Sequence, residues 1–553
     1  MKKVFGCIIV FVLSYWVLKP LFATGYFPMH DDTQVARVVE MGRALRGGQF
    51  PVRWVSELGY GLGYPIFNFY GPLPYYVGGF FYALGVSGLI ATKLMMGIGL
   101  IGAGIAMYVA VSEIVGISGG VLAAVFYMYA PYHAVDAYVR GAVGEYWALI
   151  FLPIIFLGVW RIIHKKTASG LLLGASGIAG VVLSHTILGY ASIAITGFAC
   201  VFLTGWYARV KDWVRVKTFV FLILLGLGLS AFFWLPAITE MKYTNVASQI
   251  SATADYHDHF VCLPELWNSI WGYGGSAKGC LDGFSMKIGK VHLITSLLVL
   301  FTMALGFIRG RRAKELAGAG TVILLMSVFF MLPVSTRVWE VLPLFSYLQY
   351  PWRFLTFATF GVSLTVGVLV YVVRNSYVRW VIVGAAIIVL LFVEAKRFVP
   401  QYTYDRPEAD FETASDIRYR VSKISDEYLP AAVVRPTKVE DALRDTIAKS
   451  DTYELTVNEL SDTYNKFTFL SGQDNTVVIR VAYFPGWHFM VNENVVVPTI
   501  ENGLPVVTVP SGFTVVQMQF RDTTVRAIGN WISLISLVLY IFIYDRKNKK
   551  IIS

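Results

Sequence analysis

Residues 354–372 read FLTFATFGVSLTVGVLVYV, a stretch of 19 residues without a charged side chain. A helix of about 20 apolar residues crosses a hydrocarbon layer about 30 Å thick. The whole chain of 553 residues has a matching composition, with 56% hydrophobic and only 15% charged residues. A soluble domain carries roughly 25% charged residues, and a disordered chain contains few aromatic residues. The sequence therefore predicts a polytopic α-helical membrane protein.

Similar apolar runs recur along the chain, and each is long enough to span a membrane. The segment 73–88 is also apolar, but counting it as a crossing would put every later basic loop opposite the N-terminal Lys2 and Lys3. We therefore interpret 73–88 as re-entrant or interfacial, with about twelve crossings in total and both termini in the cytoplasm. The runs begin near residues 4, 90, 117, 146, 168, 188, 216, 291, 316, 354, 378 and 527.

The net charge is +11, and Lys and Arg gather in short loops between the apolar runs. This is the positive-inside pattern of a multi-pass protein of a cytoplasmic (inner) membrane, rather than the basic surface of a nucleic-acid-binding protein. The same topology predicts five extracytoplasmic segments, and the unusual polar residues fall in them. These segments are 23–89, 133–145, 237–290, 334–353 and 396–526.

The last of these segments has a different composition. Alternation typical of strands begins at Tyr453, and β-rich runs at 476–481, 495–497 and 505–509 are separated by turn signals. We expect an extracytoplasmic β-sandwich. The chain then divides into a transmembrane domain with catalytic external loops at 1–395, a β-rich domain at 396–526, and a final transmembrane helix with a basic tail at 527–553.

Two of the four cysteines lie in the polar segment 237–290. Cys262 and Cys280 are predicted to form a disulfide, which persists only in an oxidising compartment. His257 and His259 have metal-capable side chains, but neighbours this close in sequence point apart, so we expect the disulfide to order the loop rather than a metal ion.

An acidic pair, Asp31 and Asp32, follows the first span and precedes an amphipathic pattern from Val35 to Leu45. One carboxylate is enough to cap a helix N-terminus. The other has no such explanation, and a carboxylate at the membrane boundary costs a few kcal/mol unless it has a partner, a metal ion or a catalytic role. A cap and a functional site both remain open at this point.

The first loop continues GYGLGYPIFNFYGP at 59–72, where glycine and aromatic residues alternate. Irregular backbone near a membrane persists only where protein buries it or where it lines a wet cavity. One interpretation is a structural aromatic belt. The interpretation we favour is a cavity lined by stacking rings, with Asn68 and Tyr70 among its residues, suited to sugars or an isoprenoid chain.

The acidic pair and the run GYPIFNFYGPLPYY at 63–76 resemble the bacterial membrane family labelled "6-pyruvoyl-tetrahydropterin synthase-related". The label implies no pterin chemistry. The arrangement is similar to the GT-C superfamily of polyprenyl-phosphate-sugar glycosyltransferases, and YFPGW at 483–487 resembles the YfhO family. The resemblance implies a second acidic site in the next external loop, which would fall to Asp136 and Glu145. A plain solvated loop residue remains an alternative for Asp136.

The stretch Tyr350-Pro351-Trp352-Arg353 enters a span from the outside and offers a phosphate site. Arg353 could clamp phosphate oxygens with its planar guanidinium group, and the alternative is a snorkelling anchor beside an interfacial Trp. Further candidates are Arg140, Arg53 and Arg337 for phosphate, and His185, which is otherwise a packing residue inside its span.

These features predict a membrane enzyme of GT-C type that transfers a sugar from a polyprenyl-phosphate donor to a glycan, lipid or protein acceptor on the outer face. Asp31 would be the general base, Asp32 would cap its helix or assist, and Arg353 would stabilise the leaving phosphate. The cofactor is unknown, and a divalent metal ion bridging Asp31 and Glu145 is one option. The rival hypotheses are a non-catalytic transporter or flippase of lipid-linked glycans and a cell-envelope assembly scaffold. No P-loop, GxSxG, HExxH or paired CxxC motif supports another enzyme class.

Overall fold

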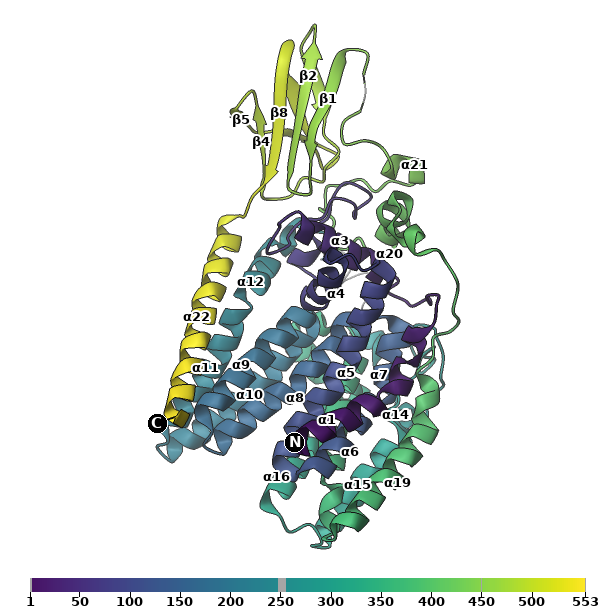
Figure 1. Cartoon of the computed structure of the whole chain (residues 1–553), viewed down its shortest axis with the longest axis vertical. Helices are drawn as coiled ribbons and strands as arrows, with labels where there is room; N and C mark the ends of the chain where they lie inside the picture. Colours follow the sequence, from purple (N-terminus) through teal and green to yellow (C-terminus); the bar gives the residue numbers. More distant parts are fainter. Residues whose placement is uncertain (1, 247–254, 449, 553) are drawn as a thin grey trace.

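The computed structural model describes residues 2–246, 255–448 and 450–552 (Figure 1). It is a bundle of helices with β-strands at one end, and both chain termini lie in the helical part. Among the described residues, eight helices are long and apolar enough to cross a membrane. They are α5 (Gly88–Val115), α8 (Val143–Ile163), α9 (Thr167–Ser184), α10 (Thr186–Arg209), α16 (Arg311–Met331), α18 (Leu355–Val366, within the span Pro351–Val372), α19 (Ser376–Glu394, within the span Ser376–Arg397) and α22 (Thr524–Ile552).

Two further spans are bent. α1 (Lys2–Leu13) is followed by α2 (Tyr15–Leu18) with a bend of 44°, and α11 (Trp213–Leu229) is followed by α12 (Ala231–Glu240) with a bend of 72°. Counting each bent pair as one span, the described part of the chain holds ten helices or helix pairs that meet the length and composition of a crossing.

The prediction of about twelve crossings is therefore too high by this measure. The other two predicted runs form α6 (Ile117–Met128) and α15 (Lys290–Ala304), with 12 and 15 residues. Helices of that length rise only about 18–23 Å. α6 stops early because Ala130, which precedes Pro131, adopts an extended backbone with ψ 137°.

The segment 73–88 forms α4 (Leu73–Ala83), whose 11 residues rise only about 16 Å and do not cross. It packs against α3 (Gln34–Arg46) through glycine on both helices. A Cβ at Gly42 would lie 2.4 Å from the Tyr82 ring, and one at Gly79 would lie 2.5 Å from Met41. This close packing agrees with an interfacial or re-entrant helix pair. The shorter helices α7 (Pro131–Val135), α14 (Leu263–Trp267), α17 (Thr336–Val341), α20 (Ser422–Ile424) and α21 (Val439–Ala442) lie in connections.

The amphipathic pattern after the acidic pair does form a helix, α3, but its polar face is not solvated. Arg37 and Glu40 are 3% and 1% exposed. Arg37 donates to Ser425 Oγ at 2.7 Å, and the Glu40 carboxylate accepts from Arg43 and from the backbone N–H of Glu57, each at 3.0 Å. The segment 405–428 therefore contributes to the cover of a helix that the sequence pattern placed at the membrane surface.

The strands lie within 453–520 and form two antiparallel sheets, with the orders β1-β2-β8-β4-β5 and β3-β7-β6. Burial alternates along β2 and β8, as expected when one face of a sheet packs on a core. Two hairpins close on the predicted turn residues, Asn492-Glu493 and Asn502-Gly503, and all four have positive φ as type I′ turns require. The strands are β1 (Tyr453–Leu460), β2 (Tyr464–Ser471), β3 (Asn475–Val478), β4 (Trp487–Val491), β5 (Asn494–Val496), β6 (Thr499–Glu501), β7 (Leu504–Val509) and β8 (Gly512–Phe520).

The glycine and aromatic run of the first loop is irregular, as predicted, but most of its rings pack against other rings, chiefly Tyr419 and Tyr428 of the C-terminal segment, rather than face a cavity. Phe69 lies 5.3 Å from Tyr428 in a stacked arrangement and 6.1 Å from Phe484. The Ala482 N–H donates to the Leu62 carbonyl at 2.6 Å. The rings thus connect the helical part to the C-terminal part.

A buried ion cluster fastens α22 beside α12, where Figure 1 shows the two helices side by side. Arg526 is 0% exposed and donates to Glu240 Oε2 from Nη2 at 2.9 Å and from Nε at 3.0 Å. The same oxygen accepts from Asn68 Nδ2 at 2.7 Å, and Arg526 also donates to the carbonyl of Pro485 at 2.9 Å. One carboxylate therefore joins the first loop, α12, the strand domain and the last span.

Arg526→Ala should destabilise the protein strongly, because it leaves the buried Glu240 charge unpaired, at a cost of about 3–5 kcal/mol. The measurement is the temperature at which half of the purified protein remains monodisperse on size-exclusion chromatography after heating. Arg521→Ala is the matched control, because Arg521 is exposed and its guanidinium group, among the described residues, bonds only the nearby Gln519 side chain. Equal midpoints for the two variants would contradict the role of this cluster.

Candidate active site

A cavity of about 540 Å³ opens where the N-terminal end of α3 meets residues 140–145, the loop 255–288 and the segment 422–428. Charged residues of both signs line it. They are Asp31, Arg37, Arg140, Glu145, Arg353 and Glu427. Eight of the residues named from the sequence lie on its wall, and they are Asp31, Tyr70, Arg140, Glu145, His185, Tyr350, Trp352 and Arg353.

The first loop is aligned with residues 139–140 by backbone hydrogen bonds. The N–H of His30 donates to the carbonyl of Val139 at 3.0 Å, and the N–H of Asp31 donates to the carbonyl of Arg140 at 2.9 Å. Gln34, in the first turn of α3, donates from Nε2 to the Asp31 carbonyl at 3.0 Å. These bonds fix Asp31 beside Arg140 at the edge of the cavity.

The Asp31 carboxylate makes no hydrogen bond and no ion pair among the described residues. It is not a helix cap, because Thr33 is the N-cap residue of α3 and no side chain bonds the first turn there. Burial raises the pKa of Asp31, while the guanidinium groups of Arg140 and Arg37 oppose this rise. An unpaired carboxylate on a cavity wall, with its pKa raised by burial, is a group that can accept a proton from a ligand.

Asp32 is placed differently from its neighbour. Its carboxylate accepts from Arg420 at 3.0 Å, and the residue does not line the cavity. Burial raises its pKa and Arg420 lowers it. Of the acidic pair, Asp31 faces the cavity and Asp32 joins the first loop to the C-terminal segment.

Glu145, in the first turn of α8, holds two guanidinium groups. Arg140 donates to it from Nη1 at 2.7 Å and from Nη2 at 2.8 Å. Arg353 donates from Nε at 3.0 Å, and the Tyr132 hydroxyl donates at 2.9 Å. Both carboxylate oxygens are occupied by these donors, so Glu145 positions the arginines.

The turn that carries Arg140 is a single π-helical turn, Asp136–Arg140, ended by Gly141 at φ 67°. A Cβ at Gly141 would lie 2.2 Å from the Met29 sulfur, so only glycine fits between the two external loops. Asp136 bonds Arg140 through Oδ1 at 2.6 Å, and its Oδ2 is buried without a partner among the described residues. Burial, reinforced by the Glu145 charge, raises the pKa of Asp136 well above its usual value.

Arg353 lies on the 3₁₀ turn Pro351–Phe354 that starts the next span. Its Nη1 donates to the Leu348 carbonyl and the Gln349 side chain, each at 2.8 Å, while its Nη2 makes no hydrogen bond among the described residues. The rings of Tyr350 and Trp352 stack at 4.9 Å next to it. One face of this guanidinium is therefore left for a ligand in the cavity.

His185 and Tyr70 complete this wall. His185 interrupts the helices α9 and α10, accepts from the Leu188 N–H at 3.1 Å, and approaches Glu145 to 3.9 Å. The Tyr70 ring packs against Arg37, whose guanidinium carbon is 4.3 Å from the centre of the ring.

Three further residues named from the sequence lie away from the cavity. Arg53 and Asn68 do not line the cavity, because they bond each other at 3.2 Å and join the buried cluster around Glu240. Arg337 is exposed on α17 and does not line the cavity.

The sequence analysis missed the contribution of the C-terminal segment. Ser425, Glu427 and Tyr428 line the cavity, although the sequence assigns them to the β-rich domain. Arg37 also lines it and appeared in the sequence only as a polar position of the amphipathic helix. Glu427 lies in the segment that the composition assigns to the β-rich domain, so its sequence position did not indicate a place in this cavity.

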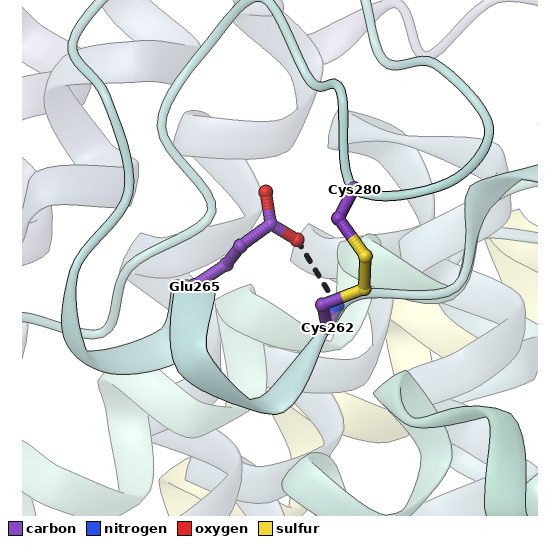
Figure 2. Close-up of side chains that lie close together, drawn as sticks. All are labelled: Cys262, Glu265 and Cys280. Atoms are coloured by element: carbon purple, nitrogen blue, oxygen red, sulfur yellow. Dashed lines mark hydrogen bonds between the residues drawn. A yellow bond between two sulfur atoms is a disulfide. The ribbon is translucent and has the colours of Figure 1, made fainter.

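Cys262 and Cys280 are disulfide-bonded, with Cα atoms 5.8 Å apart (Figure 2). The bond closes the loop that brings His259, Ser276 and Phe284 to the cavity wall. Among the described residues, only Cys262, Glu265 and Cys280 have donor atoms close enough to hold a metal ion, and the disulfide consumes both sulfurs. Asp31 and Glu145 do not fit a bridging ion, because the arginines and Tyr132 occupy Glu145.

The family model described as "6-pyruvoyl-tetrahydropterin synthase related domain; membrane protein" matches residues 67–401. This range includes Glu145 and Arg353 but neither Asp31 nor Glu427. A Lactococcus lactis subsp. cremoris protein described as uncharacterized is 24% identical over 242 residues. The match covers 42% of this chain and only 39% of the relative.

Three solved structures are similar at 13% identity. Arabinofuranosyltransferase AftD from Mycobacteria has a TM-score of 0.45 over 73% of this chain and 27% of that chain. ArnT from Cupriavidus metallidurans bound to undecaprenyl phosphate has 0.41 over 70% and 63%. The Archaeoglobus fulgidus oligosaccharyltransferase complex with Zn and sulfate has 0.37 over 78% and 58%. Likenesses this weak carry no argument about activity.

The disulfide predicts a definite pattern of thiol labelling. Cys7 and Cys200 are free, so the unreduced chain, unfolded in detergent, should add two N-ethylmaleimide groups, and four after reduction, as read by intact-mass spectrometry. Cys262→Ser should add three without reduction, because it frees Cys280. Four labels on the unreduced wild-type chain would contradict an oxidising location for this loop.

Proposed function

The chain belongs to the 6-pyruvoyl-tetrahydropterin synthase-related family of membrane proteins, and we propose that it is a membrane glycosyltransferase that moves a sugar from a polyprenyl-phosphate donor to an acceptor. The observation that carries the proposal is the unpaired Asp31 carboxylate, which shares one cavity with the arginine pair held by Glu145. A base and a phosphate site in one cavity are what transfer from a phosphate ester requires.

The donor side of this site is the wall formed by Arg140, Arg353 and Glu145. Two guanidinium groups face the carboxyl groups of Glu145 and Asp136, and burial raises the pKa of Asp136, which favours its neutral form and a net positive charge on this wall. The free Nη2 of Arg353 is suited to a phosphate oxygen, and charge-assisted hydrogen bonds of this kind are strong in a cavity that excludes bulk water. The rings of Tyr350 and Trp352 keep the guanidinium in place.

The reaction we propose is a single displacement. The acceptor hydroxyl forms a bond to the anomeric carbon as Asp31 takes its proton. The bond from that carbon to the phosphate oxygen breaks, and the electron pair leaves with the polyprenyl phosphate. Arg353 stabilises the negative charge that builds on the phosphate. Asp32 has no part in these steps, because Arg420 holds it.

We place this chemistry at the outer face of the cytoplasmic membrane, with both termini in the cytoplasm and the β-sheets outside. The positive-inside distribution of Lys and Arg supports this orientation. The disulfide in the cavity wall supports it independently, because such a bond persists in an oxidising compartment.

Asp31→Asn should reduce sugar transfer by about 10²- to 10⁴-fold, because the amide cannot accept the acceptor proton. The measurement is mass spectrometry of lipid-linked sugars and cell-surface glycans in cells with the wild-type protein, without it, and with Asp31→Asn. Cells without the protein and cells with Asp31→Asn should both accumulate one polyprenyl-phosphate sugar and lose one glycan modification.

Asp405→Asn is the control, because it removes a carboxylate outside the cavity in the same external region. Native mass spectrometry should show undecaprenyl phosphate bound to Asp31→Asn but lost from Arg353→Gln. Full rescue of the null phenotype by Asp31→Asn would refute the enzyme and favour a flippase, and an unchanged glycan profile in the null would favour a scaffold.

Arg37→Gln should move the acid limb of the activity profile to higher pH. Asp31 acts only when ionised, so activity falls as the pH drops through its pKa. Burial raises that pKa and Arg37 lowers it, so removing the Arg37 charge lets the pKa rise further. The measurement is the pH dependence of transfer in membranes. Arg37→Lys should restore the wild-type profile, and Arg46→Gln, an exposed position on the same helix, should leave it unchanged. An unshifted limb in Arg37→Gln would count against Asp31 as the base.

A further inference from the structure

Asp31 and Glu427 form an acidic part of the cavity wall around Arg37, although Asp31 also lies beside Arg140. We define the acidic wall as Asp31, Glu427 and Arg37, all of which line the cavity. Arg37 is 3% exposed and forms no ion pair within 4.0 Å among the described residues, although its charge favours ionisation of both carboxylates. Two carboxylates against one guanidinium leave this wall with net negative charge.

Glu427 has fewer hydrogen-bond donors than its carboxylate can accept. Both of its oxygens accept from the single hydroxyl of Ser425, at 3.0 and 2.9 Å. An ionised carboxylate offers about four acceptor sites, and leaving them empty in a partly dry cavity is costly. Burial accordingly raises the pKa of Glu427. The geometry leaves room for donors that come from a ligand.

A second polar group on the same side also lacks a partner. Thr33 lines the cavity and is 1% exposed, and its Oγ1 has no hydrogen bond among the described residues. Two aromatic rings flank the acidic wall: Tyr70 below Arg37, and Tyr428, whose ring is fixed by stacking on Phe69 at 5.3 Å. Carboxylate, hydroxyl and tyrosine side chains together match the hydroxyl groups and apolar faces of a sugar ring.

We propose that the acceptor is a saccharide without acidic groups, bound through its hydroxyl or ammonium groups by Glu427. This proposal rests on the proposed function, which supplies Asp31 as the base for the same acceptor. A neutral or aminated sugar gives donors to Glu427 and Thr33. A uronic acid or phosphorylated sugar meets the net negative charge of the acidic wall and is rejected. Glu427 therefore determines acceptor specificity, and the segment 422–428 forms the acceptor side of the cavity.

The test uses the full chain in detergent and saturation-transfer NMR with three soluble probes. They are methyl β-D-glucoside, methyl β-D-glucosaminide and methyl β-D-glucuronide. We expect NMR saturation transfer to the glucoside and the glucosaminide, and about tenfold weaker apparent binding of the glucuronide. Glu427→Gln should weaken binding of the two favoured probes about tenfold, because hydrogen bonds to a charged acceptor are stronger than those to an amide. It should also reduce discrimination against the glucuronide.

Glu440→Gln is the matched control, because Glu440 is exposed on α21 of the same C-terminal region. Glu427→Asp keeps the charge and should keep rejecting the glucuronide, which separates recognition from loss of fold. Glucuronide binding as strong as glucoside binding, unchanged probe binding in Glu427→Gln, or no binding of any probe would each overturn the proposal.

Asp31→Asn separates this proposal from the proposed function. It should abolish sugar transfer in cells but leave binding of the glucoside and the glucosaminide intact, since these two probes bind through Glu427 and the Asp31 proton acceptor is needed only for the reaction. Saccharide binding that depends on Glu427, together with unchanged lipid-linked sugar pools, would refute the transferase and keep the saccharide site. If Asp31→Asn alters the lipid-linked sugar pools but Glu427→Gln leaves probe binding unchanged, only the assignment of Glu427 to the acceptor site is refuted.

Discussion

The carboxylate of Glu145 holds two guanidinium groups that come from separate parts of the chain, and the cavity depends on this interaction. Glu145 is 1% exposed, so its charge is stable only while Arg140 and Arg353 remain bonded to it. Arg140 ends the π-helical turn Asp136–Arg140, and Arg353 lies on the 3₁₀ turn before α18, so the bonds to Glu145 hold both turns in place. Removing this carboxylate would leave two like charges side by side at a membrane boundary.

The position of Asp31 follows from the same interaction. Its backbone N–H bonds the carbonyl of Arg140, so the turn that Glu145 holds also sets the register of the first loop. The carboxylate and the arginine pair are therefore held by one rigid arrangement of backbone rather than by two independent loops. In the proposed reaction, a fixed separation between Asp31 and the arginine pair would place the acceptor hydroxyl against the anomeric carbon.

Sequence reasoning located Asp31, Glu145 and Arg353 because a charge beside a long apolar run is costly and needs a reason. The sequence also suggested Arg53 as a phosphate ligand and Asn68 as a residue of the ring-lined cavity, but both are satisfied by mutual hydrogen bonding in the cluster around Glu240. Sequence alone shows that a polar group is unusual and does not show which partner satisfies it. The sequence predicts more crossings than the eight to ten that helix length and composition support among the described residues, because hydropathy does not show where Pro131 ends a helix.

Glu427 was missed because an acidic residue in a polar segment has no such signal, and the composition boundary near residue 395 hid its role. That boundary separates apolar from polar sequence, but it does not separate the cavity from the rest of the chain. The polar face of α3 carries Arg37 and Glu40, which need hydrogen-bonding partners once they are buried. Ser425 supplies one for Arg37, and the same segment brings Glu427 to the cavity. The segment that covers the polar face of α3 therefore also completes the cavity wall. The helical part without this segment would lack the part of the wall that carries Ser425, Glu427 and Tyr428.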